Sequence, residues 1–262
     1  MTPPDSLSCL VTGAGGDIGR AITARLLAGG HRVAALDISV PALARLAAAH
    51  PEQPRLLTAH ADIRDLASIR AALEAAEAAL GPPDVLINNA GGVTAPTLSA
   101  TSEADWLADI ELNLNGPFRC IHAVAEGFVA RGRGTILNVA SVNGLGVFGH
   151  PGYSVAKAGL IHLTRFCATE YGRHGIRSVA LCPGTVRTQA WEARRAAQPD
   201  ILDAALAWYP SRDISTPDDV AAAIEALLNP SLRLMNGAVI TLDGGLTAGS
   251  DLLASAFTGT PL

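Results

Sequence analysis

Tyr153 and Lys157 have the residue types and the spacing to do chemistry together. Lys157 is the only lysine in the chain, and the other 18 basic residues are arginine. Residues 153–166 have the apolar spacing of a helix, which places the phenol and the ammonium on one face, about 5–6 Å apart at Cβ. A neighbouring cation lowers the pKa of a phenol, and a phenol tuned towards neutrality can exchange a proton during turnover. The alternative is a surface pair on an amphipathic helix.

A glycine-rich segment near the N-terminus has the features of a phosphate-binding turn. It follows an apolar strand predicted over 7–12 and precedes a helical pattern over 20–28. Glycine lets the backbone approach a pyrophosphate, and a helix N-terminus offers free N–H groups and the positive end of a dipole. The alternative is an ordinary tight turn. We expect a dinucleotide to contact Gly13, Gly15, Gly16, Asp17, Ile18 and Gly19.

An acidic residue, Asp37, ends the second predicted strand, over 31–36. It lies about 20 residues after the glycines, where a carboxylate hydrogen-bonds the ribose hydroxyls of NAD. Its charge would repel the 2′-phosphate of NADP, and Ile38 stands where an arginine could have neutralised that phosphate. The expected cofactor is therefore NAD; the alternative is that Asp37 is a turn or cap residue.

Strand and helix patterns alternate along the chain. Further strands are predicted over 55–61, 84–88, 134–141, 176–182 and 237–242, and further helices over 41–50, 66–80, 102–130 and from 217. This alternation is typical of a doubly wound parallel sheet with helices on both faces. We predict an α/β fold: one Rossmann-type domain over 1–262 with a seven-stranded parallel sheet. The long connection 189–215 is expected to be a substrate lid.

Polar residues stand at the predicted strand ends and inside one helix. Ligands bind at the carboxyl ends of strands in such sheets, where Asn89 and Ser141 fall. Asn113 and Asn115 are poor interior helix residues. The alternatives are a strand-end cap for Ser141 and a satisfied core amide or kink for Asn113.

Composition narrows the class of protein. The net charge of −5 and the scattered arginines argue against nucleic acid as a partner. The four cysteines lack a Cys-x-x-Cys spacing, so we expect reduced core thiols and no metal site. Neither a signal peptide nor an 18-residue apolar stretch is evident. A cytoplasmic protein with a small-molecule partner and no membrane association is expected.

Together these segments resemble the compact branch of the short-chain dehydrogenase/reductase family, over roughly 7–245. The residues that carry the resemblance are Thr12-Gly13, Asn88-Asn89-Ala90-Gly91, Asn113, Ser141, Tyr153-x-x-x-Lys157, Pro183-Gly184-x-Val186-x-Thr188 and Asp243-Gly244-Gly245.

The resemblance implies a NAD-dependent oxidoreductase that transfers a hydride between a secondary alcohol and NAD. In it, Tyr153 is the general acid/base and Ser141 hydrogen-bonds the same substrate oxygen. Lys157 holds the nicotinamide ribose and depresses the pKa of the phenol, while Asn113 positions a water that relays protons. Family members are tetramers or dimers built through the Tyr153 helix and the last strand, so a homotetramer or homodimer is implied. Further cofactor contacts are implied for Asp62, Ile63, Asn89, Ala90, Gly91, Tyr153, Lys157, Pro183, Gly184, Val186 and Thr188.

The chain departs from the family pattern at Asp17, where the compact branch has glycine. The spacing Gly13-x-x-Gly16-x-x-Gly19 fits the longer branch, which includes sugar-nucleotide epimerases. The short length and the Asn88–Gly91 motif favour the compact branch. We interpret Asp17 as a helix N-cap whose carboxylate could repel a pyrophosphate.

Substrate recognition is expected from the lid and from the loop before Tyr153. Arg194 and Arg195 of the lid could bind a carboxylate, sulfonate or phosphate, which favours a sugar or sugar acid as substrate. The alternative is that these two arginines form a solvated face of the lid. The lid aromatics could instead line an apolar pocket for a steroid or cyclic alcohol. The candidate substrate residues are Ser141, Asn143, His150, Tyr153, Trp191, Arg194 and Arg195.

Two other classes of protein remain as alternatives. One is a catalytically silent NAD-sensing or scaffold protein on the same fold, which the complete set of Asn113, Ser141, Tyr153 and Lys157 disfavours. The other is an epimerase or dehydratase that holds its cofactor permanently.

Overall fold

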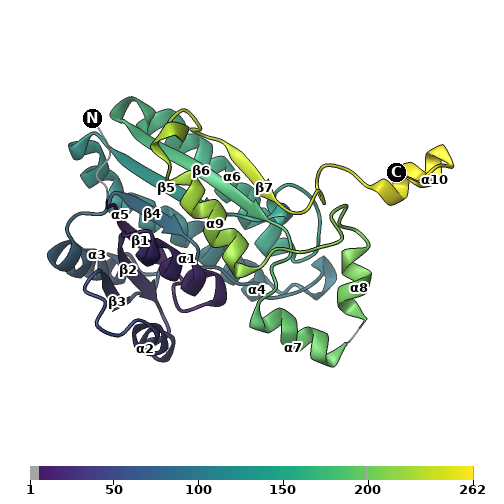
Figure 1. Ribbon diagram of the computed structural model, residues 1–262, viewed down its shortest axis with the longest axis horizontal. Helices are drawn as coiled ribbons and strands as arrows, with labels where there is room; N and C mark the ends of the chain where they lie inside the picture. The colour runs from purple at the N-terminus through teal and green to yellow at the C-terminus, as the bar shows by residue number, and fades with distance from the viewer. Residues whose placement is uncertain (1–5, 199, 262) are drawn as a thin grey trace.

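A parallel β-sheet with helices on both faces forms the body of the protein (Figure 1). The computed structural model describes residues 6–198 and 200–261. Within them the sheet has seven strands, all parallel, as predicted, and their order is β3-β2-β1-β4-β5-β6-β7. The strands are β1 (Ser8–Thr12), β2 (Arg32–Asp37), β3 (Leu56–His60), β4 (Val85–Asn88), β5 (Gly134–Val139), β6 (Ile176–Pro183) and β7 (Val239–Leu242).

Helices connect successive strands, and one more follows the last strand. They are α1 (Asp17–Ala28), α2 (Val40–Ala49), α3 (Leu66–Leu80), α4 (Glu103–Ile110), α5 (Gly116–Arg131), α6 (Pro151–Tyr171), α7 (Gln189–Ala197), α8 (Ile201–Leu206), α9 (Pro217–Leu227) and α10 (Asp251–Thr258). None of the helices in the described part of the chain is long and apolar enough to cross a membrane.

The apolar core lies on both faces of the sheet. Successive side chains of a strand point to opposite faces, so Cys9 and Val11 of β1 enter the core that α1 and α9 cover. Leu10, between them, enters the core that α3 and α5 cover. This double burial explains why the strands are near-continuous apolar runs in the sequence.

The order of the strands reverses between β1 and β4. From β1 the chain builds outward through β2 and β3, and it then returns to add β4 on the other side of β1. The connections after β1 and β4 therefore leave the sheet in opposite directions, and a crevice opens at the carboxyl ends of these two strands. The glycine-rich turn and Asn89 lie at this position.

The predicted helix over 102–130 is interrupted. A π-helical segment over Glu111–Asn115 separates α4 from α5. Pro117 follows it, and proline has no N–H to give to the carbonyl four residues before it. The ordinary α-helical bond to the Asn113 carbonyl is therefore missing, which accounts for a local change of pitch.

Two other expectations differ from the structure or are refined by it. Gly16, not Asp17, is the N-cap of α1, so the interpretation of Asp17 as the cap is wrong. The connection 189–215 contains α7 and α8. The C-terminal helix α10 stands away from the body (Figure 1), and none of its residues is buried.

Candidate active site

The glycines of the first turn are required for different reasons. A Cβ on Gly13 would lie 2.7 Å from the Ala90 Cα, and one on Gly19 would lie 2.1 Å from the Gly13 oxygen. The fold itself excludes side chains there. A Cβ on Gly16 would meet only the Gly13 oxygen, at 3.6 Å, and the backbone of Gly16 is ordinary (φ −75°). Its missing side chain therefore relieves no clash and instead leaves room for a ligand at the N-terminus of α1.

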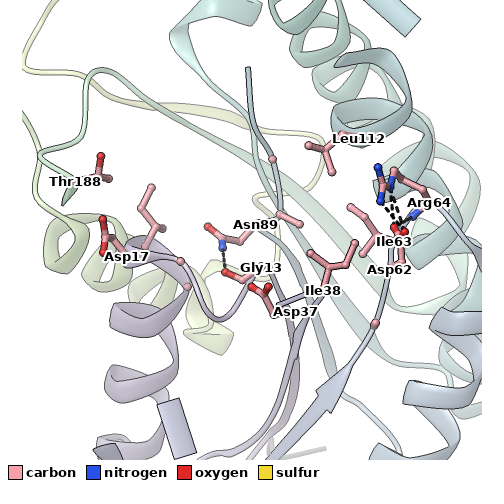
Figure 2. A pocket seen from close by; sticks show the side chains of 16 residues that line it. Gly13, Asp17, Asp37, Ile38, Asp62, Ile63, Arg64, Asn89, Leu112 and Thr188 are labelled. Carbon is pink, nitrogen blue, oxygen red and sulfur yellow. Dashed lines mark hydrogen bonds and ion pairs between the residues drawn. The ribbon is translucent and has the colours of Figure 1, made fainter. Parts of the chain in front are cut away.

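A first cavity of about 410 Å³ runs from this turn across the ends of β1, β2 and β4 (Figure 2). It brings together twelve residues predicted to bind the cofactor and four that were not predicted, Ile38, Ala61, Arg64 and Leu112. The predicted residues that line it are Gly13, Gly16, Asp17, Ile18, Gly19, Asp37, Asp62, Ile63, Asn89, Ala90, Gly91 and Thr188.

Gly15 is set apart from this cavity and supports it. Its N–H donates to the Asp37 carboxylate at 2.8 Å, and a Cβ on it would lie 2.6 Å from that of Ala42. The second Asp37 oxygen accepts from the Ser39 N–H at 2.8 Å. Two backbone donors thus fix the carboxylate at the end of β2, and its remaining lone pairs can serve a ligand in the cavity.

An ion pair that sequence reasoning missed lies at the far end of this cavity. The Nε and Nη2 of Arg64 donate to the Oδ1 and Oδ2 of Asp62, at 2.9 and 2.8 Å (Figure 2). The hydrogen bond from Arg64 is the main cause that lowers the pKa of Asp62. Only the close spacing of the two residues could have signalled it.

Asp17 joins the glycine turn to the lid. One carboxylate oxygen accepts from the Arg20 guanidinium, which also donates to the Gly15 carbonyl at 3.0 Å. The other accepts from the backbone N–H of Gln189, the first residue of α7, at 2.7 Å. A guanidinium and a helix N-terminus therefore compensate the negative charge that we expected to repel a pyrophosphate.

Tyr153 and Lys157 share one face of α6. The Lys157 Nζ lies 5.4 Å from the centroid of the Tyr153 ring and donates to the Val139 carbonyl at 2.8 Å. The ammonium is buried, and burial lowers its pKa to about 8.

The expected lowering of the Tyr153 pKa is wrong. Burial raises the pKa of Tyr153 more than the hydrogen bond with Ser141 lowers it. The reasoning from sequence counted the neighbouring charge but not the loss of water around both groups.

The Ser141 loop is held by Asn143. The Asn143 backbone N–H donates to the Ser141 hydroxyl at 3.2 Å. Its side-chain amide donates to the Gly149 carbonyl at 2.9 Å and to the Ser154 hydroxyl at 3.1 Å. Both amide protons are thus used, by Gly149 in the loop and by Ser154 in α6, and the Ser141 hydroxyl donates to the Asn143 Oδ1 at 3.4 Å, so Asn143 positions Ser141.

The Asn113 side chain is a satisfied buried amide, as one alternative held. It donates to the carbonyls of Gly92 and Asp109, each at 2.9 Å, and accepts from the Gly92 N–H at 3.2 Å. A Cβ on Gly91 would lie 2.8 Å from the Asn113 Oδ1 and 3.5 Å from the Lys157 Nζ. The π-helical segment thus docks beside the buried lysine.

A second cavity, of about 750 Å³, lies beyond Thr188, a residue that also lines the first cavity. Of the predicted residues, Gly184 and Val186 line this second cavity, and Pro183 belongs to the buried strand β6. The side chains of Arg194 and Arg195 lie outside those that the structure describes. The predicted substrate residues that line the second cavity are Ser141, Asn143, His150, Tyr153 and Trp191.

Comparison with known proteins agrees with this arrangement. Residues 13–247 match the model of a family described as enoyl-(acyl carrier protein) reductase. A crystal structure of an oxidoreductase from Burkholderia thailandensis, described as a member of the short-chain dehydrogenase/reductase family, superposes with a TM-score of 0.90. It shares 42% identity, over 97% of this chain and 98% of that one.

The chain belongs to the short-chain dehydrogenase/reductase family. An uncharacterized oxidoreductase of Schizosaccharomyces pombe is 38% identical over 93% of this chain and 92% of its own length. The 2-(R)-hydroxypropyl-CoM dehydrogenase of Xanthobacter autotrophicus is 36% identical over 91% of this chain and 98% of its own. Relatives of this short-chain dehydrogenase/reductase thus include oxidoreductases that act on hydroxyl groups.

Proposed function

We propose that this short-chain dehydrogenase/reductase oxidises a secondary alcohol to a ketone with NAD. The observation that carries the proposal is the juxtaposition of Tyr153, Ser141 and Lys157 with two cavities that share Thr188. The open space in front of Gly16 suits a pyrophosphate, and the Asp37 carboxylate suits the free ribose hydroxyls of NAD.

Each residue of the site has a role in this proposal. Tyr153 takes the proton of the alcohol oxygen and Ser141 hydrogen-bonds that oxygen. NAD held in the first cavity would supply the hydride acceptor. Lys157 holds the ribose beside the nicotinamide and supplies positive charge near the phenol. Burial is the main cause that raises the pKa of the Tyr153 phenol, so the rate of alcohol oxidation is expected to rise with pH.

Asn113 supports proton transfer through its backbone. Its side chain is fully used by Gly92 and Asp109, but its carbonyl lacks the usual helical donor because Pro117 has no N–H. That carbonyl is therefore our candidate acceptor for the water that carries the proton from Lys157 to solvent.

The experiment is a dehydrogenase assay with NAD and, separately, NADP on a panel of secondary alcohols, sugars and 2-hydroxypropyl-CoM. We expect NADH absorbance to appear, and Tyr153→Phe to lower kcat/KM by at least 100-fold. NAD binding by calorimetry serves as the control, because the variant must still bind the cofactor. A Tyr153→Phe enzyme with full activity would refute the mechanism.

The two other classes of protein make different predictions. A silent NAD-binding protein would bind NAD in calorimetry and turn over nothing on the panel. An epimerase or dehydratase would retain nucleotide through purification, which absorbance of freshly isolated protein detects.

We also propose a cytoplasmic homotetramer or homodimer assembled through α6. Phe118 on α5 and Val155 and Phe166 on α6 are exposed large apolar side chains, and such residues are enriched where subunits meet. Light scattering coupled to size-exclusion chromatography tests this; a monomer at micromolar concentration would contradict it.

A further inference from the structure

The second cavity offers few free hydrogen-bonding groups. The Asn143 amide is used by Gly149 and Ser154. The Tyr209 hydroxyl accepts from the Thr185 N–H and donates to the Thr185 Oγ1, both at 2.9 Å. These polar side chains line the cavity, yet their N–H and O–H donors are already paired. A sugar, whose every hydroxyl needs a partner when buried, would be poorly served here.

The described lining of this cavity also carries no fixed charge. None of its residues is aspartate, glutamate, lysine or arginine, and the remainder is rich in apolar and aromatic side chains. These side chains are Val93, Val142, Phe148, Val186, Trp191, Trp208 and Leu246. Such a surface favours an apolar molecule whose few polar atoms meet specific partners.

His150 is a polar group of this cavity that the fold holds in a defined orientation. Its Nδ1 lies 3.1 Å from the Ala95 carbonyl oxygen, and its backbone N–H donates to the Pro96 carbonyl at 3.0 Å. Its φ of +54° is left-handed, which is uncommon for a residue other than glycine. Two contacts to the 95–96 segment and a strained backbone thus hold the imidazole at the cavity wall, just before α6.

The Ala95 contact determines which nitrogen of His150 carries a proton. A carbonyl oxygen can only accept, so Nδ1 must be the donor. In the neutral ring, Nε2 then has a lone pair and no proton. Because His150 lines the cavity, this nitrogen is the acceptor that it offers to a bound molecule.

We infer that the substrate is an apolar alcohol with one further hydroxyl group, which donates its hydrogen bond to the Nε2 of His150. The reacting oxygen meets Tyr153 and Ser141, the second hydroxyl meets His150, and the carbon frame contacts the aromatic wall. This inference rests on the proposed dehydrogenase activity. It favours the cyclic-alcohol alternative over a sugar or sugar acid.

The test compares cyclohexanol with cyclohexane-1,2-diol, -1,3-diol and -1,4-diol as substrates with NAD. We expect the best diol to exceed cyclohexanol in kcat/KM by about 10-fold, the gain of one well-made hydrogen bond. In His150→Asn this ratio should fall to near 1. Asparagine tolerates the left-handed backbone, and His150→Gly, which adopts it without strain, provides a second variant. Thermal unfolding of both variants checks that the fold is kept.

Two kinds of outcome overturn the inference alone. One is oxidation of cyclohexanol with no advantage for any diol, or with an advantage that survives both His150 substitutions. The other is a preference for glucose, or for 2-hydroxypropane-1-sulfonate, over every diol, which would point to polyhydroxyl or anion recognition. A wild-type protein that oxidises none of these alcohols would refute the dehydrogenase proposal itself, and the inference with it.

Discussion

Replacing Asp17 by alanine should separate cofactor binding from substrate turnover. In the structure this carboxylate accepts the backbone N–H of Gln189 at 2.7 Å, as an N-cap would for α7, and it also pairs with Arg20. Because α7 carries Trp191 of the second cavity, Asp17 links the glycine turn to the substrate side. Loss of this carboxylate should loosen α7. The backbone N–H groups that we assign to cofactor binding are kept.

The magnitude follows from the two contributions of Asp17 to α7 that alanine removes. Loss of a capping acceptor costs about 1 kcal/mol, and loss of a negative charge at a helix N-terminus costs roughly 0.3–1 kcal/mol. A total of about 1–2 kcal/mol corresponds to roughly a 5–30-fold smaller population of the docked lid. We expect kcat/KM for the alcohol to fall by this factor. NAD binding should stay the same or tighten, since a carboxylate near the pyrophosphate is gone.

The assay combines steady-state kinetics with calorimetry of NAD binding and with Trp191 fluorescence in a background of Trp106→Phe and Trp208→Phe. Asp17→Asn is the matched control, because it keeps an oxygen for the Gln189 N–H while removing the charge. It should lose less than the alanine variant. Equal losses in NAD affinity and in alcohol kcat/KM, or an alanine variant within two-fold of wild type, would refute the coupling.

Three further predictions concern charge and proton transfer. Lys157→Met should raise the free energy of unfolding at pH 7 by about 1–3 kcal/mol, because folding drives the lysine pKa down to about 8. The unfolded lysine keeps its proton to about pH 10, so the wild type should gain free energy of unfolding between pH 8 and 10. Urea titrations in which the difference in free energy of unfolding between the two proteins does not narrow over this range would contradict the prediction. Asp37→Asn should lower the NAD-to-NADP ratio of kcat/KM at least 10-fold, by removing the repulsion of a 2′-phosphate; an unchanged ratio would exclude Asp37 as the selector. Pro117→Ala should lower kcat several-fold with NAD affinity retained, since the new N–H competes for the Asn113 carbonyl; calorimetry beside turnover measurements would reveal a loss of binding instead.

The sequence by itself determined the features that depend on neighbours along the chain. Apolar runs of strand length alternating with helical patterns predicted a seven-stranded parallel sheet with helices on both faces. Tyr153 and Lys157 share a face because one turn of helix separates them, which is a local property. The glycine turn was recognisable because its strand and its helix adjoin it directly.

Tertiary structure alone decided the features that depend on distant groups. One partner of Asp17 is Gln189, which lies 172 residues away in the sequence. No local pattern could therefore show that Asp17 caps the lid helix α7 and not α1. The direction of the Tyr153 pKa also depends on packing, because burial by the surrounding chain outweighs its hydrogen bond. The role of Asn143 in positioning Ser141 likewise depends on the hydrogen bonds from its amide to Gly149 and Ser154. Residue types along a chain specify which bonds are possible, whereas the fold determines which donors, acceptors and waters remain within reach.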